Sequence, residues 1–117
     1  MRLAIFALIG SAALAQAPAD VEFFEKEVRP LLRSNCQGCH SVDGSAGAGP
    51  SWKGIWGRQS EFADGGKSAG DENYIRESIL EPQAHLVKGF GPVMPSYKGI
   101  LQDKEIDAII SFMKTLQ

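Results

Sequence analysis

The five residues Cys36-Gln37-Gly38-Cys39-His40 constrain this chain more than any other feature. They form the pattern C-x-x-C-H, which is typical of covalent c-type haem attachment. Each thiol can add across one vinyl group of the macrocycle, and the adjacent histidine then lies against the iron as a ligand. The chain has two cysteines and two histidines, and three of these four residues lie in the motif. The motif therefore predicts one covalent haem c, attached through Cys36 and Cys39, with His40 on the iron.

Two other interpretations of the cysteine pair are weaker. A C-x-x-C redox disulfide belongs beside a βαβ pattern, and no part of this sequence alternates like a strand. A structural zinc site requires four suitably spaced ligands, and the adjacent Cys39 and His40 are poorly placed to share one ion. We therefore keep haem attachment as the prediction.

The N-terminal residues have the pattern of an export signal. Arg2 supplies a short positive segment, and residues 3–14 form an apolar run without a charged residue. An A-x-A cleavage site ends at Ala15, so we expect a signal peptide over residues 1–15 and one haem-binding domain over residues 16–117. The alternative is an uncleaved membrane tether, which is disfavoured because the run is shorter than the ~20 residues that a span requires. Export would place the protein in the periplasm.

Length and charge bound the class of protein further. After the signal, about 100 residues remain, which make one small domain, and a covalent macrocycle would help to fill its limited core. The whole chain carries 12 basic and 14 acidic residues, a net charge of −2, and no basic block. A net negative charge and the lack of a basic block do not suit a nucleic-acid-binding protein, so we expect no nucleic-acid partner.

Helical periodicity occurs in three parts of the sequence. Behind Asp20, a candidate N-cap, apolar residues recur at helical spacing up to Pro30, where we expect a kink or a restart. Asp71 is expected to cap a second helix that stops before Pro82. A last helix should begin around Asp103 and bury the apolar stripe Ile106, Ile109, Ile110, Met113 and Leu116.

Between these helices lie long segments rich in glycine and proline. Residues 41–70 and 81–99 show no regular periodicity. Stretches of this length without structure normally count against an assignment, but loops can enclose a flat cofactor that no helix or sheet could wrap. The predicted fold class is therefore all-α, with three to five short helices and long loops around one haem.

The second axial position of the iron needs its own candidate. Met94 lies in a loop, 54 residues after His40, and is followed by Pro95, which would stiffen that loop. A thioether ligand raises the reduction potential relative to a second imidazole. A lone methionine more often fills a gap in a core, and we assign that role to Met113. His85 is the competing ligand, and bis-histidine ligation would lower the potential.

With these residues in view, the sequence resembles a known family. Its mature part is similar to class I c-type cytochromes, and most closely to the cytochrome c domain at the C-terminus of some bacterial cytochrome c oxidase subunit II proteins. The matching segments are GPSWKGIWGR at 49–58, DENYIRESILEP at 71–82 and VMPSYKG at 93–99. No copper-binding cupredoxin portion precedes the haem motif, so the resemblance implies a free-standing carrier.

The resemblance also assigns roles to residues around the haem. Pro50 would direct its backbone carbonyl toward the His40 Nδ1–H and so orient the imidazole. Trp52 corresponds to an apolar residue against the macrocycle. Arg58 corresponds to a cation near a haem propionate, which is a charge-assisted contact.

Two further aromatic residues receive positions from the same resemblance. Tyr97 would form a wall of the pocket on the Met94 side. Phe112 would pack across the first helix near Phe23 or Phe24. For Tyr97 and for Trp52, ordinary core packing is the alternative, and contact with the haem does not contradict it.

The implied function is one-electron transfer, not enzymatic catalysis. Iron ligated by His40 and Met94 has no free position for a substrate, and contacts between redox partners are small and transient. We expect a soluble periplasmic monomer, with no membrane span after signal cleavage, that serves cytochrome c oxidase or a quinol-oxidising complex of a respiratory chain. The alternatives are a catalytic or gas-sensing haem module with an open or His-ligated sixth site, and a haem subunit of a dehydrogenase complex.

Three lysines are candidates for steering a redox partner. Lys53, Lys88 and Lys98 lie in the segments expected near the haem, and positive charges there could guide an acidic partner. A solvated surface without this role is the alternative, and the net negative charge argues against a globally basic docking surface.

Overall fold

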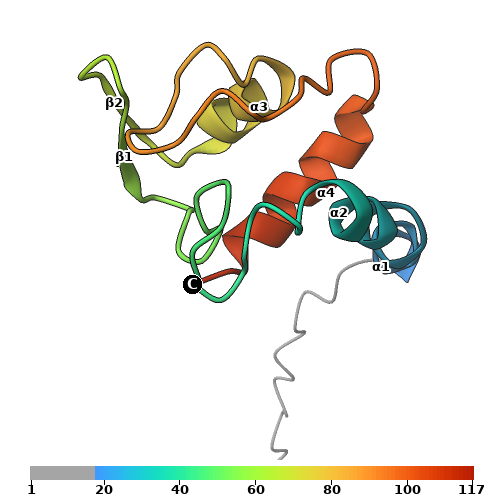
Figure 1. The fold of residues 1–117 in the computed structure, drawn as a ribbon. Helices are drawn as coiled ribbons and strands as arrows, with labels where there is room; N and C mark the ends of the chain where they lie inside the picture. Colours follow the sequence, from blue (N-terminus) through green and yellow to red (C-terminus); the bar gives the residue numbers. More distant parts are fainter. Residues whose placement is uncertain (1–17) are drawn as a thin grey trace, which may run out of the picture.

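Helical segments, one short β-hairpin and long loops make up residues 18–117, which the computed structural model describes (Figure 1). The predicted signal peptide, residues 1–15, and the expected mature start at residue 16 lie outside this range. Within residues 18–117, no helix combines the length and the apolar character needed to cross a membrane. The mainly helical architecture confirms the predicted fold class.

The first helical segment passes through three geometries in succession. α1 (Pro18–Phe23) leads into a π-helical turn, η1 (Phe24–Val28), and α2 (Arg29–Asn35) follows directly. Pro30 lies in the first turn of α2. Because proline has no N–H and its ring crowds the carbonyl four residues earlier, a wider turn before it accommodates the ring. The predicted interruption at Pro30 is thus a π-helical turn with a helical restart.

The predicted N-cap of this segment is wrong. Asp20 lies inside the first turn of α1, which begins at Pro18. Proline suits a first turn because its missing N–H would have no intrahelical partner there. The carboxylate of Asp20 still lies near the positive end of the helix dipole, where an acidic residue is favourable.

A β-hairpin interrupts the first long loop, although the sequence predicted no strand. β1 (Gln59–Glu61) and β2 (Lys67–Ala69) pair antiparallel, with Ser60 opposite Ser68. Ser60 is buried between two exposed neighbours, so alternation exists but spans only three residues. Strands this short, built from residues of low β propensity, give no detectable period-two pattern.

The two later helices begin where the sequence predicts. α3 (Glu72–Leu80) is capped by Asp71, whose carboxylate accepts a hydrogen bond of 2.8 Å from a backbone N–H of the first turn. α4 (Asp103–Lys114) follows Gln102, whose N–H donates to the Glu105 carboxylate at 3.0 Å. These caps satisfy backbone groups that the helix itself leaves unpaired.

The hydrophobic core lies where α4 packs against the first helical segment and α3 (Figure 1). Phe112 of α4 packs on Phe24, with ring centroids 5.5 Å apart, so the predicted crossing of the two terminal helices is confirmed. Leu116 is only half-buried at the edge of the core. The rest of the predicted stripe is fully buried: Ile106, Ile109, Ile110 and Met113.

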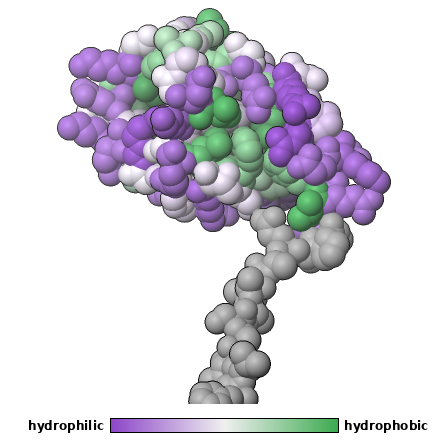
Figure 2. Space-filling model, turned by 90° about the horizontal axis from the view of Figure 1, so that it is seen from below, coloured by the Kyte–Doolittle hydropathy of each residue, from purple (hydrophilic) through white to green (hydrophobic). Residues whose placement is uncertain are grey.

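Apolar side chains also reach the surface. On the face seen in Figure 2, a band of hydrophobic residues crosses the middle, and hydrophilic residues lie on both sides. Scattered exposed apolar residues are ordinary on a protein surface and do not by themselves indicate an interaction site. The large apolar side chains that are at least 41% exposed within the described residues are Val21, Val42, Val93 and Ile100.

Candidate haem site

The cysteine–histidine motif follows directly on α2. Cys36 is the C-cap of this helix, and the N–H of His40 donates to the Cys36 carbonyl at 2.9 Å, which closes the next turn. Cys36 is half-buried and Cys39 is exposed. Burial, with a smaller contribution from Cys39, raises the pKa of the Cys36 thiol. The turn brings both sulfur atoms and the imidazole to one pocket.

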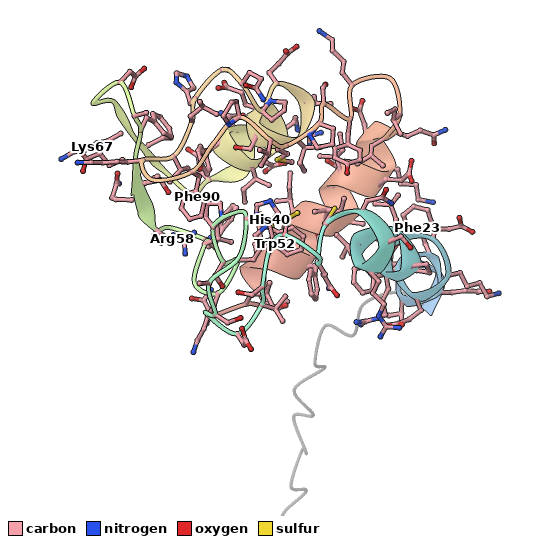
Figure 3. The ribbon with its side chains drawn as sticks, in the orientation of Figure 1. Phe23, His40, Trp52, Arg58, Lys67 and Phe90 are labelled. Carbon is pink, nitrogen blue, oxygen red and sulfur yellow. The ribbon has the colours of Figure 1, made fainter. Side chains whose placement is uncertain are left out.

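This pocket collects all the site residues that the sequence predicts. The cavity between them has a volume of about 130 Å³. Figure 3 shows His40 and Trp52 together near the middle of the fold, with Arg58 toward β1. The predicted residues that line the pocket are Cys36, Cys39, His40, Pro50, Trp52, Arg58, Met94 and Tyr97.

The imidazole of His40 is fixed by a hydrogen bond and by ring stacking. Its Nδ1 lies 2.7 Å from the Pro50 carbonyl oxygen. Because a carbonyl only accepts, Nδ1 carries the hydrogen and Nε2 keeps its lone pair. The buried Trp52 ring stacks against His40 with 5.2 Å between centroids and 17° between planes. The orientation expected from Pro50 is therefore present, and Nε2 is available to a metal.

Gly49 allows the loop to approach this ring, a role that the sequence did not reveal. A Cβ at position 49 would overlap the His40 ring, so the close approach requires glycine. The N–H of Gly49 donates to the Cys39 carbonyl at 3.0 Å, and the N–H of Trp52 donates to the Ser41 carbonyl at 2.8 Å. The density of glycine before Pro50 indicated a loop but could not single out one position.

Arg58 lies at the edge of the pocket and is tied to the same loop. Its guanidinium donates to the Ser51 carbonyl at 2.9 Å and to the Lys53 carbonyl at 3.1 Å. Guanidinium has five N–H donors, so these two bonds leave donors for a ligand anion. The arrangement is compatible with the expected propionate contact and adds a loop-bracing role that the sequence did not predict.

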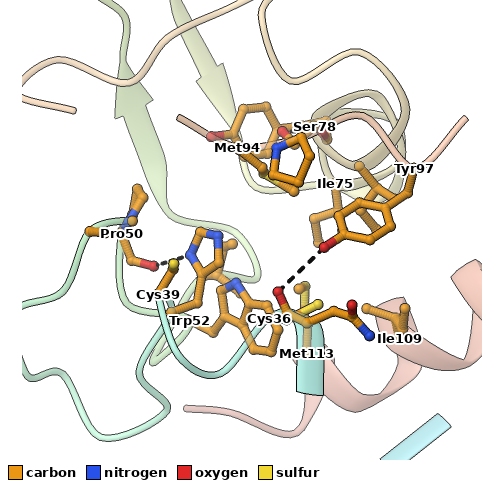
Figure 4. A pocket seen from close by; sticks show the side chains of 18 of the residues that line it. Cys36, Cys39, Pro50, Trp52, Ile75, Ser78, Met94, Tyr97, Ile109 and Met113 are labelled. Atoms are coloured by element: carbon orange, nitrogen blue, oxygen red, sulfur yellow. Dashed lines mark hydrogen bonds between the residues drawn. The ribbon is translucent and has the colours of Figure 1, made fainter. Parts of the chain in front are cut away.

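The opposite wall is formed by α3 and the loop that carries Met94. Figure 4 shows Met94 and Ser78 across the pocket from Cys39, Pro50 and Trp52. Met94 is half-buried. Its loop is tied to carbonyls at the end of α3, which accept from the Tyr97 N–H at 3.1 Å and from a serine Oγ at 2.6 Å.

Tyr97 connects this loop with the cysteine–histidine motif. Its hydroxyl donates to the Asn35 carbonyl at 3.3 Å (Figure 4). Burial raises the pKa of the Tyr97 hydroxyl, and the nearby Cys36 and Cys39 add to the shift. Tyr97 thus lies where the resemblance placed it, as a wall of the pocket on the Met94 side.

His85, the competing ligand, is outside the set of residues that line this pocket. Its Nε2 lies 3.3 Å from a carboxylate oxygen of Glu77. Its ring stacks on Phe62 with 4.7 Å between centroids. These contacts direct His85 toward α3 and the hairpin loop.

The donor set of the pocket fits a covalent haem. Two thiols separated by two residues, an imidazole with a free Nε2 and a thioether on the facing wall are the groups that c-type haem uses. The walls between them are mainly apolar. Zinc would require at least three or four ligands in one place, and within residues 18–117 no three His, Cys, Asp or Glu side chains are grouped in this way.

Fold and site together define a class I c-type cytochrome. In agreement, the cytochrome c family model matches residues 25–117, and the chain belongs to this family. Over 90 residues it is 30% identical to cytochrome c2 iso-2 of Magnetospirillum molischianum, a match that covers 70% of this chain and 91% of that protein. Over 98 residues it is 26% identical to cytochrome c2 iso-1 of Magnetospirillum fulvum, covering 75% and 97% respectively.

Membership of this family establishes the cofactor and the general role. The chain carries one haem c, bound covalently through Cys36 and Cys39, and it is an electron carrier, not an enzyme. The resemblance to class I c-type cytochromes is confirmed at this level. The narrower resemblance to oxidase subunit II bears on the electron acceptor.

Proposed function

We propose that this protein carries single electrons through the periplasm, from a respiratory donor to a terminal oxidase, with its iron ligated by His40 and Met94. The observation that carries the proposal is the placement of these two side chains on facing walls of one mainly apolar pocket. When bound, the haem supplies an iron centre that takes up and releases one electron.

On one wall, the chain prepares an imidazole ligand. The Pro50 carbonyl keeps the hydrogen on Nδ1 of His40, 2.7 Å away, and thereby directs the Nε2 lone pair into the pocket. A hydrogen bond of this kind also makes the imidazole a stronger donor to a metal. Trp52 restricts rotation of the ring by stacking on it.

On the other wall, Met94 offers a neutral sulfur that exchanges no proton. A thioether at the sixth position leaves no site for a substrate, and it raises the reduction potential. Pro95 restricts the backbone next to it. His85 is turned toward Glu77 and Phe62, which favours Met94 as the ligand.

The remaining residues keep the pocket dry and its charge balanced. Apolar side chains from α3 and α4 form its floor and exclude water: Ile75, Ile79, Ile109 and Met113. Arg58 holds its positive charge at the pocket edge through two loop carbonyls. A fixed cation there would compensate a carboxylate of the cofactor without moving during electron transfer.

The compartment and the partner rest on sequence features. The signal-like residues 1–15 support export to the periplasm, and the similarity of 49–58, 71–82 and 93–99 to the oxidase-linked domain supports a terminal oxidase as acceptor. Reduced holoprotein should be reoxidised by respiratory membranes, and cyanide should block this step. Reoxidation that persists with cyanide would exclude an oxidase as the acceptor.

The ligation is tested by a pair of variants of the holoprotein. Met94→Ala should remove the methionine-to-iron charge-transfer band, lower the midpoint potential and allow carbon monoxide to bind the reduced protein at neutral pH. His85→Ala is the matched control and should change none of these properties. If His85→Ala opens the sixth position, or if the unaltered protein binds carbon monoxide at neutral pH, the proposed ligation is wrong.

A further inference from the structure

The mouth of the haem pocket carries almost no charge. Its two bordering segments, 35–50 and 89–102, contain only Asp43 and Lys98 as acidic or basic residues, although 22% of the whole chain is charged. The pocket-lining residues that are exposed to solvent are all uncharged: Asn35, Cys39, Ala48, Val93 and Pro95. We call the exposed residues of these two segments the rim surface.

Of the two charges on the rim surface, Lys98 is paired with an opposite charge, and Asp43 is hydrogen-bonded within its own turn. The ammonium of Lys98 lies 2.9 Å from the carboxylate of Glu81. The Asp43 carboxylate accepts from the N–H of Ser45 at 2.9 Å and from its hydroxyl at 2.6 Å. Both bonds lower the pKa of Asp43, and they hold it within its own turn.

Two other cations near the pocket also have polar partners. Lys88 lies 3.5 Å from Glu61, and Arg58 donates to two loop carbonyls. Lys53 is exposed beside the first segment, and one lysine does not make a field that could steer a partner over long range. The lysine-steered docking considered from the sequence is therefore not favoured by this arrangement.

Exposed apolar side chains are concentrated on the same surface. Three of the four large hydrophobic residues that are exposed within residues 18–117 belong to its two segments: Val42 at 41%, Val93 at 69% and Ile100 at 69%. Val21, in α1, is the exception. Of these three residues, Val93 lines the haem pocket itself.

We propose that the rim surface docks a protein redox partner whose own docking face is uncharged and apolar. A charged face would lose its hydration against this surface without gaining an opposite charge, whereas an apolar face loses little and buries Val93 and Ile100. Such a pair associates without electrostatic steering, so its rate depends only weakly on salt. This inference rests on the proposed function.

Electrode surfaces of defined chemistry test this docking preference with the holoprotein itself. Voltammetry on gold coated with methyl-, carboxylate- or ammonium-terminated monolayers measures electron transfer at each surface. We expect the fastest exchange on the methyl surface, changing less than about twofold between low and high ionic strength. Fastest exchange on carboxylate, with about a tenfold loss on adding salt, would overturn the proposal and indicate docking through lysines.

Variants on both sides of the mouth locate the contact. Val93→Asp and Ala48→Asp should each slow exchange on the methyl surface by about fivefold or more, as expected for residues at the centre of a contact. Val21→Asp adds the same charge at an exposed apolar position on α1 and should leave the rate unchanged. An equal effect of Val21→Asp would contradict docking at the rim surface.

A soluble mediator separates this inference from the function on which it rests. If the holoprotein shows a normal one-electron wave with the mediator but no preference for the methyl surface, only the docking inference fails. If no reversible wave is found with mediator or electrode, the proposed function fails. The charge-transfer band of each variant, recorded alongside, shows whether its pocket is intact.

Discussion

The two walls of the haem pocket differ in how tightly the chain holds them. On the His40 side, Trp52 is buried, Gly49 lies against the imidazole ring, and short hydrogen bonds close the loop on itself. On the Met94 side, the methionine is half-buried and its neighbours Val93 and Pro95 are exposed. The first wall is organised by local contacts, whereas the second depends on contacts with distant parts of the chain.

Those distant contacts come from the β-hairpin and the end of α3. Phe62, which follows β1, forms an isolated β-bridge with Val87, and the N–H of Ala63 donates to the Leu86 carbonyl at 2.8 Å. On the other side of the loop, the Ser96 hydroxyl donates to the end of α3. The loop of Met94 is therefore held at two points, and loosening either one should change ligation before it unfolds the domain.

The largest effect is expected from a substitution that loosens the Met94 side of the pocket. Phe62 is only 5% exposed, and Phe62→Ala should cost about 3–5 kcal/mol of stability because it leaves a cavity. Since the Phe62 ring stacks on His85 of the same loop, 4.7 Å between centroids, its removal should loosen the loop, and the methionine-to-iron band should disappear at a lower alkaline pH than in the unaltered protein. A pH titration of the band measures this.

Phe112→Ala is the matched aromatic truncation on the opposite side of the core, where Phe112 packs on Phe24. It should lower the free energy of unfolding and leave the pH midpoint of the band in place. If both variants shift the midpoint equally, the band follows global stability and the hairpin has no particular hold on Met94.

The next largest effect is expected from a substitution that displaces the His40 ring on the opposite wall of the pocket. Gly49→Ala places a Cβ into the imidazole ring, and overpacking of this kind costs about 1–3 kcal/mol. Because the ring must shift, the variant should yield less holoprotein and a changed midpoint potential. Haem content per polypeptide and potentiometry measure the two effects.

Gly38→Ala is the control for this change, since a Cβ at position 38 meets no atom within 4 Å. It should match the unaltered protein in haem content and potential, although it lies inside the motif. Equal losses in the two variants would show that glycine is needed for haem attachment and not for the approach to His40.

A smaller effect is expected where the Met94 loop is hydrogen-bonded to the end of α3. Ser96→Ala removes the 2.6 Å bond to the Leu80 carbonyl, which should cost about 1 kcal/mol. Because the loop is then freer to open, added imidazole should displace Met94 more readily. Spectral titration with imidazole measures this, and Ser111→Ala, at an exposed position of α4, should leave the affinity unchanged.

The smallest expected effect concerns the pH dependence of stability. Burial raises the pKa of Tyr97 above its ordinary value of 10.0. The unfolded chain therefore releases this proton at lower pH than the folded chain, so stability is complete below pH 10.0 and falls as pH rises through the folded pKa. Tyr97→Phe should remove this part of the decline in unfolding experiments from about pH 8 to pH 11. If the free energy of unfolding falls equally with pH in the unaltered protein and in Tyr97→Phe, burial of Tyr97 does not contribute to the decline.

The sequence predicted the parts of the molecule that short stretches of chain determine. The haem motif, the cap at Asp71 and the buried stripe of α4 each depend on residues within a few turns of one another. Met94 was identifiable as a candidate because a methionine beside proline in a loop has no core to fill.

The remaining features depend on contacts that no local pattern records. The hairpin strands are three residues long and carry no strand signature. The role of Gly49 arises from the position of His40 nine residues earlier, and that of Arg58 from carbonyls that its loop turns toward it. Asp20 was misplaced because Pro18 begins the helix just before it.

A spectroelectrochemical titration of the holoprotein tests the central claim, that His40 and Met94 together ligate the iron of a one-electron carrier. We expect a single reversible one-electron transition, with a methionine-to-iron charge-transfer band that is present in the oxidised form and disappears on reduction. A high-spin oxidised spectrum without this band, or a reduced form that binds carbon monoxide at neutral pH, would contradict the claim.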